Sequence, residues 1–254
     1  MTQAFLDVLQ RNNLVAGFVV IGAIVWFSYL ISTRLTRGRL HGSAIAIFIG
    51  LVLAWVGGVL TGGERGLADV PVFGGIAVLG GAMLRDFAIV ATAYGVDPAE
   101  IKKAGVSGSV ALLFGVVGSF VVGAAVAWSF GYRDAVSLTT IGAGAGTFII
   151  GPVTGAAIGA SSDLIALSIA AGLAKSILVM TGTPFAARVI GLDNPQTAMV
   201  YGGLMGTTSG VAGGLAATDP RLVPYGAMTA TFYTGLGCLL CPSVLFLAVR
   251  ALVG

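Results

Sequence analysis

Long apolar runs alternate with short polar connections along almost the whole of this 254-residue chain. Each run is close to or longer than the roughly 20 residues that an α-helix needs to cross the hydrocarbon core of a bilayer. The pattern predicts about eight apolar helical segments, at 14–31, 42–60, 70–96, 104–130, 135–160, 164–187, 197–217 and 223–252. We therefore expect an all-α integral membrane protein, with one polytopic transmembrane domain over residues 1–254.

The composition agrees with a membrane protein and excludes a soluble fold. Hydrophobic residues make up 57% of the chain and charged residues only 9%, whereas soluble domains carry roughly 25% charged residues. The 40 glycines are about twice the usual share, and glycine lets membrane helices pack closely or break. The net charge of +3 does not indicate nucleic-acid binding, because the basic residues gather at segment ends.

Those basic residues predict an orientation, because cytoplasmic loops are enriched in lysine and arginine. Two connections that fall on one side carry five of the 13 basic residues: Arg34, Arg37, Arg39, Lys102 and Lys103. Eight full crossings would leave Arg188 and Arg250 on the opposite side. If segment 135–160 is a re-entrant hairpin instead, both return to the cytoplasmic side, and the sequence leaves these two topologies open.

One or two helices are expected to be interrupted, and the chain shows signs of an internal repeat. Pro152 lies inside segment 135–160 between Gly151 and Gly155, and it lacks the amide hydrogen that a regular helix requires. A plain proline kink is the alternative. Similar glycine-initiated motifs at 66–69, 131–134 and 191–194 each open a glycine-rich segment. They indicate either duplication of a two-helix unit, as in many transporters, or generic helix caps.

Charged residues inside apolar segments are the first candidates for function. Arg85 and Asp86 stand near the middle of segment 70–96, where a charge is expensive. They are separated by about 100° on a helix, so each is expected to face its own partner or a cavity. Lys175 has eleven uncharged residues before it in its segment and twelve after it. It is expected to pair with an acid such as Asp86 or Asp163, to bind a carboxylate, or to extend toward the interface.

Hydroxyl residues at the interrupted segments are the second group of candidates. A helix broken at bilayer depth exposes carbonyl oxygens that suit a hard cation and amides that suit an anion. Hydrogen bonding between helices is the alternative role for these hydroxyls. We predict a substrate-binding set of Arg85, Lys175, Gly151, Thr154, Thr207 and Thr208. We predict a sodium-binding set of Asp86, Thr147, Ser161, Ser162, Asp163 and Ser209.

No residue set predicts enzymatic chemistry. Cys238 and Cys241 form a C-x-x-C pattern inside an apolar segment, whereas a redox motif would need a soluble thioredoxin-like context. We therefore expect a protein that is not an enzyme and carries no catalytic cofactor.

Six runs resemble the M subunit of the two-component malonate/sodium symporter, the MadM family. They are 38–47 (GRLHGSAIAI), 80–95 (GGAMLRDFAIVATAYG), 132–142 (YRDAVSLTTIG), 151–163 (GPVTGAAIGASSD), 202–219 (GGLMGTTSGVAGGLAATD) and 229–240 (TATFYTGLGCLL). The resemblance implies uptake of malonate with sodium across the bacterial inner membrane, beside a small membrane partner, the L subunit. A fainter likeness to LrgB/CidB-type proteins in the second half implies the alternative, a subunit of a channel or holin-like export complex.

Overall fold

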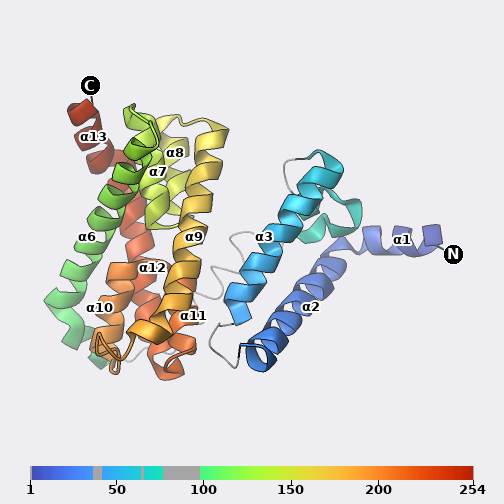
Figure 1. Ribbon diagram of the computed structural model, residues 1–254, viewed down its shortest axis with the longest axis horizontal. Helices are drawn as coiled ribbons and strands as arrows, with labels where there is room; N and C mark the ends of the chain where they lie inside the picture. Colours follow the sequence, from blue (N-terminus) through green and yellow to red (C-terminus); the bar gives the residue numbers. More distant parts are fainter. Residues whose placement is uncertain (1, 37–41, 64–65, 77–97, 254) are drawn as a thin grey trace. The chain divides into compact units, whose positions relative to one another are not determined.

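The computed structural model describes residues 2–36, 42–63, 66–76 and 98–253. They fall into two compact units, residues 1–91 and 92–254, and each unit is described by itself. Within the described ranges every secondary-structure element is helical (Figure 1), as the apolar pattern predicts. Arg85 and Asp86 lie outside these ranges, and the expectation of one domain over 1–254 stays a prediction.

The first unit is a helical hairpin preceded by a short amphipathic helix. It comprises α1 (Thr2–Arg11), α2 (Asn13–Arg34), α3 (Gly42–Thr61) and two 3-10 turns, η1 (Gly66–Asp69) and η2 (Pro71–Phe73). Helix α2 packs against α3, and η1 packs against α3 as well. Small residues of α2 such as Ala16 and Ser28 are buried, while Phe18 and Trp26 are exposed. A large aromatic residue on the outside of an apolar helix suits contact with lipid.

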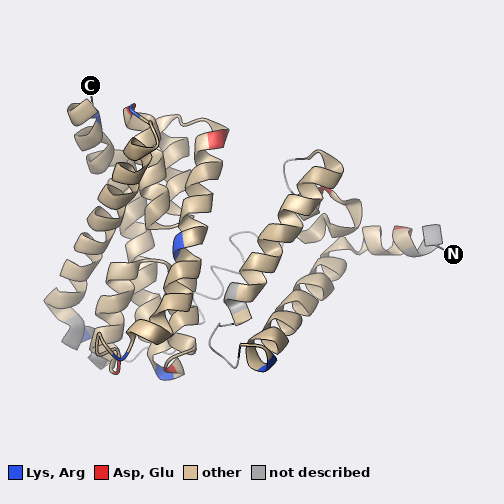
Figure 2. Cartoon of the chain, in the orientation of Figure 1, with Lys and Arg blue, Asp and Glu red and all other residues tan. Residues whose placement is uncertain are grey.

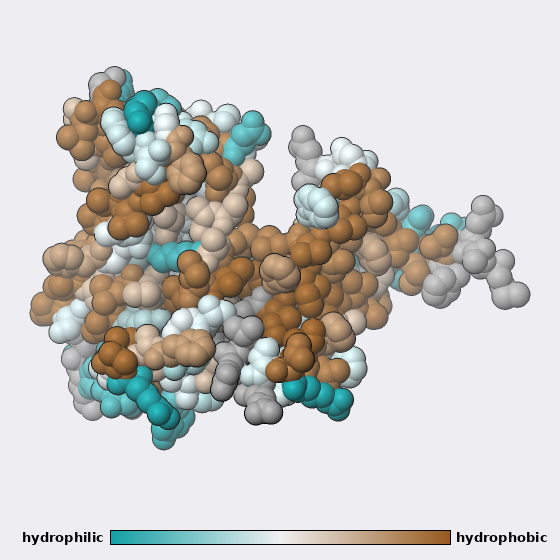
Figure 3. All heavy atoms as spheres, in the orientation of Figure 1, coloured by the Kyte–Doolittle hydropathy of each residue, from teal (hydrophilic) through white to brown (hydrophobic). Residues whose placement is uncertain are grey.

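The second unit holds a bundle of long helices with four short helices inside it. It comprises α6 (Pro98–Ser129), α7 (Ala135–Gly146), α8 (Ile150–Ile158), α9 (Ser162–Ala186), α10 (Pro195–Met205), α11 (Thr208–Ala216), η3 (Pro220–Leu222), α12 (Val223–Leu240), the π-helical turn η4 (Cys241–Leu245) and α13 (Phe246–Val253). Hydrophobic residues cover much of the visible surface (Figure 3), and exposed aromatics such as Phe114 and Phe232 contribute to it. Such a surface is expected of a protein whose solvent is lipid.

Five segments of the described chain are long and apolar enough to cross a membrane: α2, a segment that begins in α3, α6, α9, and the segment that runs from η3 to α13. The eight crossing segments predicted from the sequence are therefore not confirmed. Predicted segment 70–96 lies mostly outside the described residues, and segments 135–160 and 197–217 are each divided into two short helices.

These two divided segments form hairpins that enter the second unit from opposite ends. Helices α7 and α8 lie together near one end, and α10 and α11 lie near the other (Figure 1). With 12 and 9 residues, α7 and α8 are about 18 and 14 Å long, too short to cross a core of about 30 Å. The chain reverses at each break, so each segment returns to the end of the unit at which it started. This arrangement agrees with the re-entrant alternative for segment 135–160 and gives segment 197–217 the same form.

The two hairpins repeat one another at a spacing of 60 residues. Matched pairs are Gly131 and Gly191, Asp134 and Asn194, Gly146 and Gly206, and Thr147 and Thr207. In both copies the first helix starts at a side-chain cap: Asp134 accepts the Ser137 amide at 2.8 Å, and Asn194 accepts the Thr197 amide at 3.0 Å. Because α6 and α9 run in opposite directions (Figure 1), the copies are inverted relative to each other.

The Asp134 cap is suited to remain ionised. Burial raises the pKa of its carboxyl, but hydrogen bonds from Ser137 and from backbone amides outweigh that effect and hold the pKa below its usual value. An ionised carboxylate stabilises the positive amino-terminal end of α7.

The location of the break in segment 135–160 differs from the prediction. The chain leaves the helix after Gly146 and resumes at Ile150, whereas Pro152 lies in the first turn of α8. A proline is compatible with the first turn, because amides there have no partner within the helix. The interruption is therefore made at Thr147, several residues before Pro152.

Charged residues gather near the two ends of the second unit (Figure 2). Lys102, Lys103, Arg188 and Arg221 belong to one end, where α6 begins and α9 ends; Arg133 and Arg250 belong to the other. The larger basic group agrees with a cytoplasmic end at the start of α6. Re-entrance of both hairpins puts Arg188 at that end but Arg250 at the opposite end, so the expectation that both share one side is wrong for Arg250.

Labelling of single cysteines should report the two re-entrant hairpins. In a chain with Cys238 and Cys241 replaced by alanine, Arg133→Cys and Ser162→Cys should react with a membrane-impermeant maleimide from the same face of the membrane. Asp193→Cys and Arg221→Cys should react only from the opposite face, because α9 crosses the membrane once between the two pairs. Within each pair the chain forms a hairpin and returns to the face from which it started. Labelling of Arg133→Cys and Ser162→Cys from different faces would contradict a re-entrant α7–α8 hairpin.

Candidate functional site

The two helix breaks have the same local construction. At the first break the Thr147 hydroxyl accepts hydrogen bonds from the amides of Ile149 at 3.1 Å and Ile150 at 3.2 Å. At the second, the Thr207 hydroxyl accepts one from the Gly210 amide at 3.4 Å. Thr207 is thus the N-cap residue of α11. Thr147 ends α7 and lies before the N-cap residue of α8, Ile149, so it binds the first amides of α8 from outside that helix.

Helix α9 runs past both breaks and brings them together. A Cβ atom added at Gly172 would lie 2.1 Å from the Phe148 amide nitrogen, so the first break rests directly on the α9 backbone. One turn further on, the Ser176 hydroxyl shares a hydrogen bond with the Thr207 hydroxyl of the second break. Thus two hairpin tips that are 60 residues apart in the sequence meet the same turn of one helix.

Lys175 lies in that turn, and its ammonium is held by three neighbours. Its Nζ atom donates to the Ser119 hydroxyl of α6 at 2.9 Å and to the Gly146 carbonyl at 3.0 Å. It also lies 5.2 Å from the centre of the Tyr233 ring of α12, a distance at which a cation is attracted to an aromatic face. Lys175 is the only Lys or Arg of α9, and Figure 2 shows a basic residue midway along that helix.

Tyr233 fills the space between the two breaks. It is fully buried, and its hydroxyl donates to the Gly115 carbonyl of α6 at 3.1 Å. A Cβ added at Gly146 would lie 3.4 Å from this hydroxyl, and one added at Gly206 would lie 2.4 Å from the ring. The ring therefore touches both hairpin tips.

The electrostatics of this cluster follow from the broken helices. The carboxyl-terminal end of α7 presents carbonyl oxygens with partial negative charge, and Lys175 neutralises it. The amino-terminal ends of α8 and α11 present amides with partial positive charge. One small volume thus offers a cation, helix amides and hydroxyls to an anion, and carbonyl and hydroxyl oxygens to a cation.

The predicted substrate set is only partly gathered here. Lys175 lies at the first break, where it donates to the Gly146 carbonyl, and Thr207 and Thr208 lie at the second. Gly151 instead forms a close crossing with α9, because a Cβ added there would lie 2.5 Å from the Ser168 hydroxyl. Thr154 is fully buried on α8, and its hydroxyl has no hydrogen-bond partner among the described residues. Arg85 lies outside those residues.

The predicted sodium set is also divided. Thr147 accepts hydrogen bonds from the first amides after the first break, and Ser209 lies on the first turn of α11 with a buried hydroxyl that finds no partner in the described chain. Ser161, Ser162 and Asp163 are exposed at the amino-terminal end of α9. Thirteen residues of helix separate Ser162 from Lys175, roughly 20 Å, so these three are not beside the breaks. Asp86 lies outside the described residues.

Three residues of the cluster were missed from the sequence: Ser119, Ser176 and Tyr233. Each is an uncharged polar residue within a long, mostly apolar helix. From sequence alone, such a residue fits ordinary hydrogen bonding between helices as well as it fits a binding site. Alignment of the two 60-residue copies, which superposes Thr147 on Thr207, is the signal that could have identified the meeting of the breaks.

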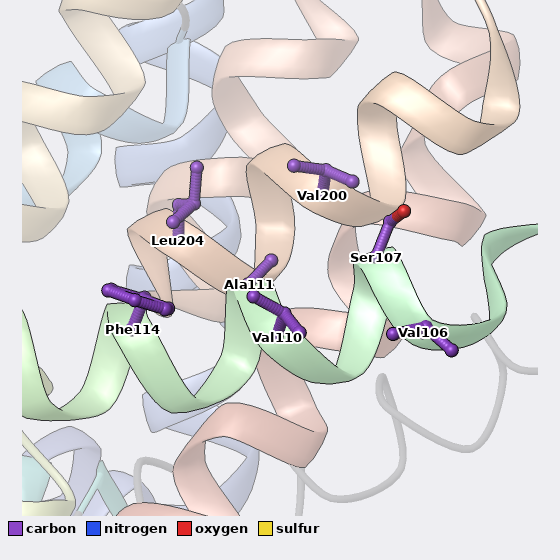
Figure 4. Close-up of a pocket in the computed structure, with 7 residues that line it drawn as sticks. All are labelled: Val106, Ser107, Val110, Ala111, Phe114, Val200 and Leu204. Carbon is purple, nitrogen blue, oxygen red and sulfur yellow. The ribbon is translucent and has the colours of Figure 1, made fainter.

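A groove of about 380 Å³ lies elsewhere in the second unit, between α6 and α10 (Figure 4). Its lining is apolar apart from one hydroxyl: Val106, Ser107, Val110, Ala111, Phe114, Val200 and Leu204. None of these residues contacts Lys175 through a hydrogen bond or ring. The groove is therefore separate from the polar cluster, and its lining offers an anion no charged group and a single hydroxyl.

Substitution of Gly206 should destabilise the second break. Its φ of 73° is strained for a residue with a Cβ, and that Cβ would overlap the Tyr233 ring. We expect Gly206→Ala to lower the free energy of unfolding by roughly 2 kcal/mol or more, seen as a lower thermal midpoint of the purified protein. Gly235→Ala on α12 is the control, because a Cβ there meets nothing within 4 Å. Equal midpoints for the two variants would contradict the packing of Tyr233 on this tip.

Comparison with known proteins gives one match, to a family model. No curated protein and no solved structure matches this chain. A family model described as the malonate/sodium symporter MadM subunit matches residues 5–253, essentially the whole chain. That match agrees with the apolar helices, the inverted hairpins and the polar cluster between their tips. The chain belongs to the MadM family of malonate/sodium symporter subunits, and it is a multi-pass membrane protein of a transporter family.

Proposed function

We propose that this chain takes up malonate together with sodium across the inner membrane of a bacterium, as the large subunit beside a small membrane partner, the L-type subunit. The observation that carries the proposal is Lys175. Among the described residues it is the one charged side chain in the middle of a helix long enough to span the membrane, and it lies between two helix breaks. A cation at that depth is expensive unless it serves an ion or substrate pathway.

Malonate is a small anion with two carboxylates, so its site needs donors for both. Lys175 would supply a charged donor to one carboxylate. The amides of the first turn of α11, with the Thr208 and Ser209 side chains beside them, would supply donors to the other. Arg85 is proposed for a carboxylate and Asp86 for the sodium ion, on the sequence alone.

Two opposed hairpins offer a route to alternating access. The α7–α8 tip reaches the centre from one end of the unit and the α10–α11 tip from the other. Movement of either hairpin away from α9 would open the central site to one side while the other hairpin keeps it closed. Rocking of one repeat against the other around a fixed site is common in transporters with inverted repeats.

Uptake by proteoliposomes tests the proposal against the channel alternative. The chain and its partner, reconstituted together, should accumulate malonate above its outside concentration only when a sodium gradient is imposed, and uptake should saturate. A channel or export subunit would instead let malonate equilibrate without regard to sodium. Sodium-independent equilibration would contradict the proposal.

Removal of the Lys175 charge should weaken malonate transport selectively. A hydrogen bond to a charged group contributes about 1.5–3 kcal/mol, so Lys175→Met should raise the KM for malonate roughly 10- to 100-fold. Lys175→Arg keeps the charge and should have a smaller effect. Lys102→Met is the control, because Lys102 is exposed near the start of α6. An unchanged KM in folded Lys175→Met protein would remove Lys175 from the substrate site.

A further inference from the structure

The Lys175 ammonium occupies a site built for a small cation. Its hydrogen-bond acceptors are a carbonyl at the negative end of α7 and a hydroxyl of α6, and the face of Tyr233 covers it. The last carbonyls of a helix receive no hydrogen bond from an amide of the same helix. The end of α7 therefore needs a hydrogen-bond donor or a cation from outside. Carbonyl and hydroxyl oxygens are also the ligands that hard cations bind in proteins. We call the Gly146 carbonyl, the Ser119 hydroxyl and the Tyr233 ring face the ammonium cradle.

We propose that the ammonium cradle is a sodium site, and that Lys175 and sodium occupy it in turn. In the structure Lys175 fills the cradle. When malonate binds, Lys175 turns from the cradle to a carboxylate, and sodium takes the vacated position. This inference rests on the proposed malonate and sodium symport and specifies where the ion binds.

The exchange follows from charge and geometry. The Lys175 ammonium lies 5.2 Å from the centre of the Tyr233 ring, and the same ring packs against Gly206 at the second tip. Only the width of this ring therefore separates the ammonium, which is bonded at the first tip, from the second tip. If the ammonium left without a replacement, the end of α7 would lose its cation in a low-dielectric interior. Sodium restores that positive charge, and the lysine and sodium together balance the two charges of a malonate dianion.

The exchange also supplies a reason for coupling. Sodium is excluded from the cradle while the ammonium occupies it, because two cations cannot share one small set of oxygen ligands. Lys175 leaves the cradle only for an anion. Malonate therefore favours sodium binding, and by linkage sodium favours malonate to the same degree.

Sodium binding to Lys175→Met tests the exchange. The chain is purified with its partner subunit, and sodium is titrated against a constant choline background while thermal stability is recorded. Wild-type protein should bind sodium weakly alone and at least tenfold more tightly with malonate. Lys175→Met should bind sodium without malonate at least tenfold more tightly than the wild type does, with little further response to malonate. Sodium affinity at or below that of the wild type would overturn the proposal.

Ser119→Ala provides a second test in which Lys175 is intact. It should lower the sodium affinity measured in the presence of malonate several-fold relative to the wild type. Added to Lys175→Met, it should likewise lower the sodium affinity relative to Lys175→Met alone. Ser129→Ala on the same helix is the matched control, because the Ser129 hydroxyl is exposed and bonds only to the Val126 carbonyl of its own helix. Equal effects of the two serine substitutions would place sodium elsewhere.

These outcomes separate the inference from the proposed function. Wild-type protein whose malonate uptake and stability ignore sodium would contradict the symport itself. Wild-type protein that responds to sodium, with variants that do not shift as described, would leave the symport in place and overturn only the ammonium cradle.

Discussion

The hydrogen bond between the Lys175 ammonium and the Gly146 carbonyl is the interaction on which the second unit depends. A helix that stops at bilayer depth leaves carbonyl oxygens that no water can reach, and each unsatisfied group costs several kcal/mol. Lys175 removes that cost at the first break and in turn acquires partners for its own charge. Helices α6, α7, α9 and α12 each contribute a group to this one arrangement, so it links all four of them.

Close packing at glycine makes the arrangement possible. The first break rests on Gly172 of α9, and the second break turns at Gly206 against the Tyr233 ring. A larger residue at either position would push a hairpin tip away from α9 and would lengthen the bonds made by Lys175 and Ser176. The high glycine content of the chain is in this sense a requirement of the polar cluster as much as of helix packing.

Much of the architecture could be predicted from the sequence, because hydropathy follows directly from the solvent. The helical class, the re-entrant alternative and the repeated motifs at 131–134 and 191–194 all appear in the described structure. The position of the first break could not be read from Pro152, since proline is compatible with a first helical turn as well as with a kink. Local sequence does not reveal which reading applies.

The candidate site was harder to predict because it depends on contacts between distant helices. Lys175 stood out by its charge alone, whereas Ser119 and Tyr233 become significant only when α6 and α12 are seen beside it. Ser161, Ser162 and Asp163 have suitable chemistry, yet the length of α9 separates them from the breaks. Composition identified the candidate ligands, and only the tertiary fold shows which of them lie together.

The two hairpins match in position and capping but differ in charge. Lys175 donates to the Gly146 carbonyl at the first break, while Gly235, 60 residues further on, occupies the equivalent position in the sequence on α12. The pseudo-symmetry of the backbone is therefore broken electrostatically. Two conformations related by exchange of the hairpins would have different energies even in an unliganded protein. Under the proposed alternating access, this single side chain would give the unliganded protein a preferred resting side.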